Sequence, residues 1–164
     1  MSDQSARSGS GSMSFLYCTD GIAAKGQDFF LLVGRVLLGW IFVQSGWRKL
    51  TNMDAFISTS PTSLQNRGVP WATFWGWIGA PLEFFGGILI LLGFATRYAA
   101  LAILLFTIAA SLIGHRYWEF TNPQQYGAQH TQFWKNMSMK GGLVLLFVAG
   151  AGRIALDWML AKRK

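Results

Sequence analysis

Charged side chains are scarce in this chain, and their scarcity decides the class of protein. They make up 13% of the 164 residues, whereas a soluble domain averages about 25%. Hydrophobic residues make up 52% and the mean hydropathy is +0.32, so water could not solvate the whole surface. The eight tryptophans and thirteen phenylalanines exceed the need of a small soluble core, and tryptophan is enriched where membrane meets water. The composition predicts an integral membrane protein.

Cysteine is limited to Cys18, which excludes an intrachain disulfide, a CxxC redox pair and a cysteine-rich metal site. Acidic residues are also few: the chain has seven Asp and Glu and fourteen Lys and Arg, which gives a net charge of +7. The basic residues lie within or at the ends of apolar segments, where they contact headgroups and set topology. They do not form the clustered patch that nucleic-acid binding requires. No phosphate-binding loop, nucleotide fingerprint or Ser/His/Asp ordering is present.

Four apolar segments are long enough to cross a hydrocarbon core of roughly 30 Å. We place them at 29–50, 71–94, about 98–115 and about 133–152. A three-span alternative would have to discard the fourth, whose MSMKGGLVLLFVAGAG sequence argues against that. Only residues 96–97 separate the second and third segments. We therefore predict an all-α fold, an integral membrane four-helix bundle with a short second/third-helix hairpin and both termini on one side.

Two regions follow from this pattern, a flexible N-terminal tail at 1–28 and a four-transmembrane-helix domain at 29–160. The tail contains SARSGSGS, which has the composition of a flexible linker. Lys and Arg are slightly more frequent on the side of the termini than on the side of the two long loops. This bias predicts that both termini lie in the cytoplasm.

Glu83 stands in the middle of the second segment, where an ionisable side chain is costly and usually faces a partner or a cavity. Gly79, Gly86 and Gly93 recur every seven residues and share a helical face with Glu83. Glu83 is therefore predicted to point into the bundle. Pro81 removes a backbone donor beside it, an irregularity found both at membrane sites and in ordinary packing.

One face of the first segment carries Arg35, Gly39, Gly46 and Lys49. Its two glycines favour this face for close helix packing. Arg35 lies roughly 9 Å inside the membrane end of its helix, and two interpretations stay open. Its side chain either extends to the cytoplasmic headgroups or reaches Glu83 on the antiparallel second helix.

A metal site at the loop side is a further alternative. His115 and Glu119 are four residues apart and, with His130, could make a set of two histidines and one carboxylate. Nothing in the sequence fixes the distance to His130, and the HExxH form is absent. We therefore expect hydrogen-bonded interfacial histidines and no metal.

The same residues carry a family resemblance. RVLLGWIFVQSGWRKL, PLEFFGGILILLGFATRYAA and KNMSMKGGLVLLFVAGAGRIALD resemble the DoxX family of small four-helix membrane proteins over about 29–157. The resemblance implies a bacterial inner-membrane protein associated with respiratory or thiol/sulfur redox systems. Motif matching carries over seven positions, with no catalytic role assigned to any: Arg35, Lys49, Glu83, Arg97, His115, Asn136 and Asp157.

Three functions are open at this point. The first is a redox-associated membrane subunit that binds a quinone and works with other membrane or redox subunits; it would be an enzyme only as part of a quinone-linked oxidoreductase. The second is a structural or assembly subunit of a larger complex, in which Glu83 pairs only with Arg35 or Lys49 to fix the helix register. Oligomerisation stays open. A small transporter is disfavoured because the chain lacks an inverted repeat. The expected ligand-binding residues are Glu83, Arg35, His115, Lys49, Asn136 and Arg97.

Overall fold

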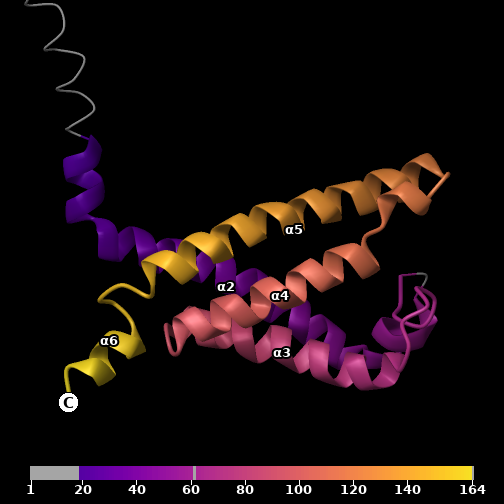
Figure 1. The fold of residues 1–164 in the computed structure, drawn as a ribbon, viewed down its shortest axis with the longest axis horizontal. Helices are drawn as coiled ribbons and strands as arrows, with labels where there is room; N and C mark the ends of the chain where they lie inside the picture. Colours follow the sequence, from indigo (N-terminus) through magenta and orange to yellow (C-terminus); the bar gives the residue numbers. More distant parts are fainter. Residues whose placement is uncertain (1–18, 61, 164) are drawn as a thin grey trace, which may run out of the picture.

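The computed structural model describes residues 19–60 and 62–163, and within these ranges the chain is helical and contains no strand. The predicted all-α class is therefore confirmed. Cys18 and most of the predicted tail lie outside the described residues, and residues 19–25 form a helical segment that leads into α2. The elements in chain order are α2 (Gln27–Thr51), the π-helix η1 (Ala55–Thr59), α3 (Ala72–Leu92), α4 (Thr96–Gly114), the 3₁₀ helix η2 (Tyr117–Glu119), α5 (Pro123–Ala149) and α6 (Leu156–Ala161) (Figure 1).

Three helical segments among the described residues are long and apolar enough to cross a membrane: Gln27–Thr51, Ala72–Leu92 and Thr96–Glu119. They match the first three predicted spans. The fourth long helix, α5, is the longest, but its N-terminal half is polar, and Lys135 and Lys140 lie on either side of its midpoint. The composition of α5 alone therefore does not mark it as a span, although α5 packs on α4 and α2.

The four long helices form a closed arrangement. Helix α2 packs on α3, α3 on α4, α4 on α5, and α5 on α2. The buried apolar residues at the centre come from all four helices, and partly buried Leu38, Leu89, Leu104 and Met139 surround them. The central residues are Phe42, Ile90, Ala99, Ala100, Ile103, Leu143 and Leu146.

Glycine makes the contact between α2 and α3 close, as the sequence predicted. Gly39 and Gly46 lie on the buried face of α2. A β-carbon at Gly46 would stand 2.5 Å from the backbone nitrogen of Phe84, and one at Gly39 would stand 3.0 Å from the carbonyl oxygen of Gly87. Because small residues let helix backbones approach, this face sets the separation of the first helix pair.

Gly46→Ala is expected to destabilise the protein by about 1–3 kcal/mol, since the added methyl meets backbone that cannot move aside. Gly34→Ala in the same helix is the matched control, because a β-carbon there meets nothing within 4 Å. It should leave stability unchanged or raise it by up to about 1 kcal/mol through helix propensity. Unfolding in detergent micelles measures both, and equal effects of the two changes would contradict the packing interpretation.

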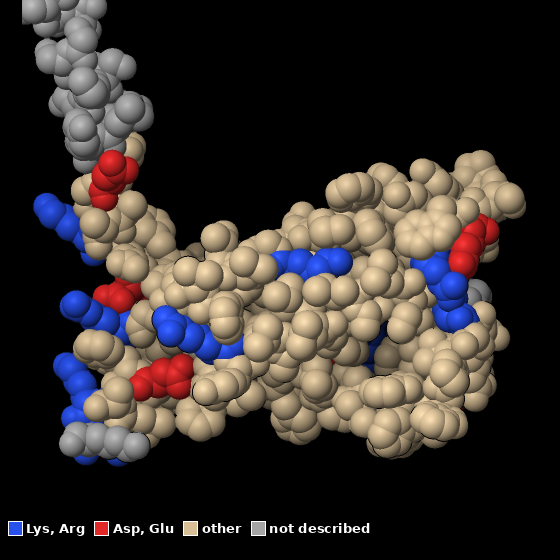
Figure 2. All heavy atoms as spheres, in the orientation of Figure 1, with Lys and Arg blue, Asp and Glu red and all other residues tan. Residues whose placement is uncertain are grey.

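Charge lies mainly at the two ends of the long axis. In Figure 2 the Lys, Arg, Asp and Glu side chains gather mostly at these ends, and the surface between them is mostly uncharged. Many large apolar side chains in this middle zone are exposed, among them Leu37, Leu105, Leu145 and Val148, at 60% or more. Because apolar surface of this extent faces lipid in a membrane protein, the bundle axis runs along the membrane normal.

The two ends of the molecule differ in what they hold. One end brings together the start of α2, the turn between α3 and α4, and α6; the other holds the loop after α2 and the joint between α4 and α5 (Figure 1). The described ends of the chain therefore lie at the same end of the bundle.

Candidate functional site

The predicted site residues divide into two groups. Lys49, Glu83, His115 and Asn136 lie toward the end with the long loops. Arg35 and Arg97 lie at the other end, beside the turn between α3 and α4. The structure therefore contains two polar clusters in place of a single site.

Glu83 faces the interior, as its glycine-flanked face predicted. It is 5% exposed, and its carboxylate accepts a hydrogen bond from the Lys49 ammonium in a salt bridge between α3 and α2. The Lys49 Nζ also lies 5.2 Å from the ring centres of Phe56 and Phe106. The result is a partly buried ion pair, with a buried carboxylate and an ammonium that lies beside two aromatic rings.

Two more titratable side chains lie within electrostatic range of this ion pair. Lys135 of α5 interacts electrostatically with both Glu83 and Lys49, and His115 at the end of α4 lies within electrostatic range of Lys49 and Lys135. The Nδ1 atom of His115 is 2.9 Å from Oε1 of Gln129. Asn136, one residue after Lys135, is buried. We call Lys49, Glu83, His115, Lys135 and Asn136 the ion-pair site.

The ion-pair site holds more hydrogen-bond donors than acceptors. The Lys49 ammonium pairs with the Glu83 carboxylate, the Lys135 ammonium lies within electrostatic range of both, and the His115 imidazole lies within range of the two ammonium groups. Such a set can donate to carbonyl or other anionic oxygens, while the carboxylate can accept a proton.

Two arginines connect the loops at this end of the bundle through salt bridges and a hydrogen bond. The Arg67 Nη1 atom donates to Glu119 over 2.8 Å, and Arg116 forms a second salt bridge with Glu119 at 2.9 Å. Arg116 also donates to the carbonyl of Arg67 over 2.8 Å. These contacts join the loop after α2 to the joint between α4 and α5.

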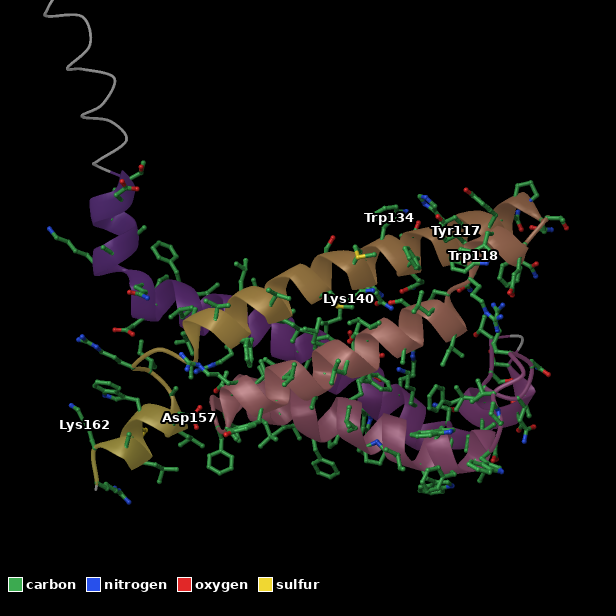
Figure 3. The ribbon with its side chains drawn as sticks, viewed as in Figure 1. Tyr117, Trp118, Trp134, Lys140, Asp157 and Lys162 are labelled. Carbon is green, nitrogen blue, oxygen red and sulfur yellow. The ribbon has the colours of Figure 1, made fainter. Side chains whose placement is uncertain are left out.

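The residues of the alternative metal set have other partners. His115 contacts Gln129, Glu119 binds Arg67 and Arg116, and His130 accepts a hydrogen bond from the Trp134 indole. Within 19–60 and 62–163, no group of three or more His, Cys, Asp or Glu is placed to hold a metal ion. Figure 3 shows Trp134 beside Tyr117 and Trp118, at the aromatic end of α5.

Both interpretations of Arg35 are wrong. Arg35 is 2% exposed, so it does not extend to the headgroups, and the partner of Glu83 is Lys49. The Arg35 guanidinium instead donates to the carbonyls of Ala151 at 2.8 Å and Ile154 at 2.7 Å. These carbonyls follow the end of α5, where backbone acceptors lack helical partners. A β-carbon at Gly93 would overlap the guanidinium, so the turn after α3 needs a glycine there.

Asp157 completes this second cluster, which we call the latch (Arg35, Gly93, Asp157 and their backbone partners). Its carboxylate accepts hydrogen bonds from the backbone nitrogens of Ala95 at 2.7 Å and Thr96 at 3.0 Å, at the start of α4. The Asp157 backbone nitrogen donates to the Gly93 carbonyl at 2.9 Å. The three motifs that carried the family resemblance therefore meet at one end of the bundle.

The pKa of Asp157 is held below its ordinary value of 3.8. Burial acts to raise this pKa, but hydrogen bonds from Thr96 and Ala95 and the charge of Arg35 together outweigh burial. A carboxyl group whose pKa is lowered by folding stabilises the fold above its ordinary pKa. That stability is lost as the pH falls through the lowered value.

Asp157→Asn is therefore expected to lower stability at neutral pH and to remove part of the acid sensitivity. The melting temperature of wild type should exceed that of the variant at about pH 6, and the difference should shrink below about pH 4. Thermal unfolding in detergent across this range measures both proteins. Asp54→Asn, at an exposed position after α2, is the control, and an equal pH profile for the two variants would contradict the role of Asp157.

Sequence reasoning missed several partners in both clusters. Asp28 accepts hydrogen bonds from the Arg153 backbone at 2.7 Å and thereby joins α2 to the segment before α6. Lys135 also lies within electrostatic range of Glu83, and no spacing in the sequence places these two residues together. Gly150 and Gly152 could have indicated the Arg35 partners. Both have positive φ at the end of α5, where backbone carbonyls lack helical partners and need a donor from elsewhere in the chain.

Comparison with known proteins gives consistent relatives. The DoxX family profile matches residues 30–116, and the SURF4 family profile matches residues 77–163. The inner membrane protein YphA of Escherichia coli is 33% identical over 80% of this chain and 90% of its own length. The inner membrane protein YqjF of the same organism is 32% identical over 85% of this chain and 98% of its own length. The uncharacterized membrane protein Rv3486 of Mycobacterium tuberculosis is 31% identical over 79% of this chain and 80% of its own length. No solved structure matches.

Proposed function

The chain belongs to the DoxX family, and from that premise we propose that it is the membrane subunit of a redox system in the bacterial inner membrane. The family resemblance supplies the redox association. The ion-pair site supplies the observation that carries the proposal, because its surplus of donors fits a ligand with carbonyl oxygens. Electron transfer would need a partner protein, since the chain has no evident electron carrier.

We infer that α5 is the fourth span, which places both termini on the same side of the membrane. We also infer that this side is the cytoplasmic one. Helix α5 packs along α4 and α2, and its C-terminal half is apolar. The slight Lys and Arg excess at the end with the termini supports this orientation. A C-terminal fusion to green fluorescent protein should fluoresce and one to alkaline phosphatase should be inactive; the opposite pair of results would reverse the orientation.

The ligand that we propose for the ion-pair site is a quinone-type head group. Lys49 and His115 would donate hydrogen bonds to its carbonyl oxygens, and the rings of Phe56 and Phe106, already against Lys49, provide apolar walls. A bound quinone supplies two-electron chemistry linked to the membrane pool. The residues of the chain orient the ligand, and Glu83 holds or releases a proton at its carboxylate while Lys49 keeps the charge compensated.

The double variant Lys49→Met/Glu83→Leu tests this proposal, because it removes the charges while filling similar volume. A photoreactive quinone analogue should label peptides of α2 and α3 in wild type, and labelling should fall about tenfold or more in the double variant. Arg48→Met, an exposed neighbour on the same helix, should label like wild type. Equal labelling of all three proteins, with no quinone co-purifying from membranes, would refute quinone binding.

A structural or assembly role is the second candidate, and the closed ion pair favours it. Lys49 and Glu83 satisfy each other without a ligand, and they fix the register of α2 against α3. In this case Glu83→Gln should weaken co-purification with a partner complex, and the apolar double variant should restore it. Loss of redox activity with assembly intact would select the first candidate.

A further inference from the structure

The end of the bundle that holds the latch is hollowed beside the turn between α3 and α4. The hollow has a volume of about 560 Å³ and is lined by the start of α4, the segment after α5, and α6. Its charged lining residues are Arg97, Arg153 and Asp157. Figure 3 shows Asp157 on α6, with Lys162 directly after the end of that helix.

The two arginine side chains at this hollow have fewer and longer polar contacts than the Asp157 carboxylate. Both oxygens of Asp157 already accept backbone hydrogen bonds. Arg97 donates one long hydrogen bond, 3.3 Å to the carbonyl of Val148. The Arg153 side chain is 72% exposed, and its nearest carboxylate oxygen, on Asp28, is 3.8 Å away. Two guanidinium groups are therefore available to an anion, and guanidinium binds phosphate oxygens well.

A third cation, Lys162, lies on this surface beside the Trp158 ring. The Trp158 ring centre lies 5.6 Å from Cζ of Arg153 and 5.5 Å from Nζ of Lys162. Tryptophan beside cations is typical of the membrane interface, where headgroups are bound.

Apolar surface continues from the hollow along the bundle. Tyr98 is 81% exposed at its rim, and the exposed side chains of Leu101, Leu145 and Val148 follow on α4 and α5, which pack on each other. A ligand seated at the two arginines would thus have uncharged helix surface beside it, in the direction of the membrane interior. A lipid has this combination of an anionic head and apolar chains, whereas free phosphate has only the anion.

We propose that the hollow between the start of α4 and α6 binds the phosphate of an anionic phospholipid, held by Arg97 and Arg153, with its acyl chains along α4 and α5. The site lies at the opposite end from the ion-pair site, so it is independent of the proposed redox function. Lipid binding here joins the turn after α3 to α6 and would stabilise the latch.

Titration of the purified, delipidated full chain with phosphatidylglycerol, followed by native mass spectrometry, tests the proposal. Wild type should bind one lipid per chain at the lowest concentrations. Arg97→Gln/Arg153→Gln should raise the half-saturating concentration about ten- to thirtyfold, since each interfacial cation contributes a factor of several. Arg153→Gln alone should raise it about threefold to tenfold, and it removes no internal hydrogen bond because Asp28 binds the backbone of that residue.

The matched control is Lys25→Gln/Arg163→Gln, which removes the same charge from two exposed positions that do not line the hollow. This control should bind lipid like wild type. Equal loss in the control and in the arginine variants would overturn the proposal, because net charge would then explain binding. Displacement of the lipid by an equal concentration of inorganic phosphate would also overturn it, since the site would then recognise the free anion.

Discussion

Lys49→Met is expected to lower the free energy of unfolding by about 3–5 kcal/mol, the usual cost of breaking a buried ion pair from one side. The reason is the Glu83 carboxylate, which is 5% exposed and would lose its cationic partner on α2. Glu83→Gln should cost less than Lys49→Met, because an amide can still accept a hydrogen bond from the ammonium. Denaturant titration in detergent micelles measures each variant.

The double variant Lys49→Met/Glu83→Leu should be closer to wild type than Lys49→Met, because replacing a whole buried ion pair with apolar groups is often neutral. The cycle formed with the single variants should show a coupling of about 1–3 kcal/mol. Additive effects, with no coupling, would mean that the two side chains do not depend on each other. The charge-exchanged variant Lys49→Glu/Glu83→Lys keeps the pair and therefore separates the two candidate functions. If the pair has only a structural role, this variant should fold and assemble like wild type. If the Glu83 carboxylate must exchange a proton with a ligand from α3, the variant should lose redox activity.

Arg35→Met is expected to cost about 3 kcal/mol, the second largest effect in the molecule. Its guanidinium makes two hydrogen bonds from a charged donor, each contributing about 1.5–3 kcal/mol, although removal of a buried charge returns part of that. The carbonyls of Ala151 and Ile154 would be left without these donors. Thermal and denaturant unfolding of the full chain in detergent give the measurement.

Arg35→Lys is the informative companion to Arg35→Met. An ammonium on a shorter stem cannot reproduce the planar fork that reaches two carbonyls, so the lysine variant should remain destabilised. Arg48→Met, at an exposed position of the same helix, should change stability by no more than about 0.5 kcal/mol. If Arg35→Lys were as stable as wild type, a positive charge alone would be sufficient at this position, and the planar guanidinium would not be required.

The helices and their packing faces were predictable from the sequence because periodicity carries that information. The spacing of Gly39 and Gly46 on α2 predicted the buried face, and the spacing of Gly79 with Glu83 predicted an inward carboxylate; both are buried in the structure. Apolar length predicted the bounds of the first three spans to within a few residues.

The pairing of charges was not predictable in the same way, because it depends on the register between helices. A long joint separates α2 from α3, so no turn fixes how far the two slide along each other. In the structure Gly46 lies against Phe84 and Arg35 against Gly93, and ten residues of helix, about 15 Å, separate Gly93 from Glu83. Lys49 instead reaches Glu83. Helix α5, the proposed fourth span, shows a different limit, because its polar N-terminal half and its lysines lower its mean hydropathy although its C-terminal end is apolar.

The latch also constrains the order in which this protein can mature. Arg35 belongs to the first long helix, yet its acceptors lie 116 and 119 residues later in the chain. During synthesis the first helix is made long before Ala151 exists, so its guanidinium must stay hydrated or bound to lipid phosphate until then. A chain ending at Gly150 would be expected to stay sensitive to added protease near α2, unlike the full chain. The segment that follows α5, made long after the first helix, thus decides when the Arg35 side chain becomes buried.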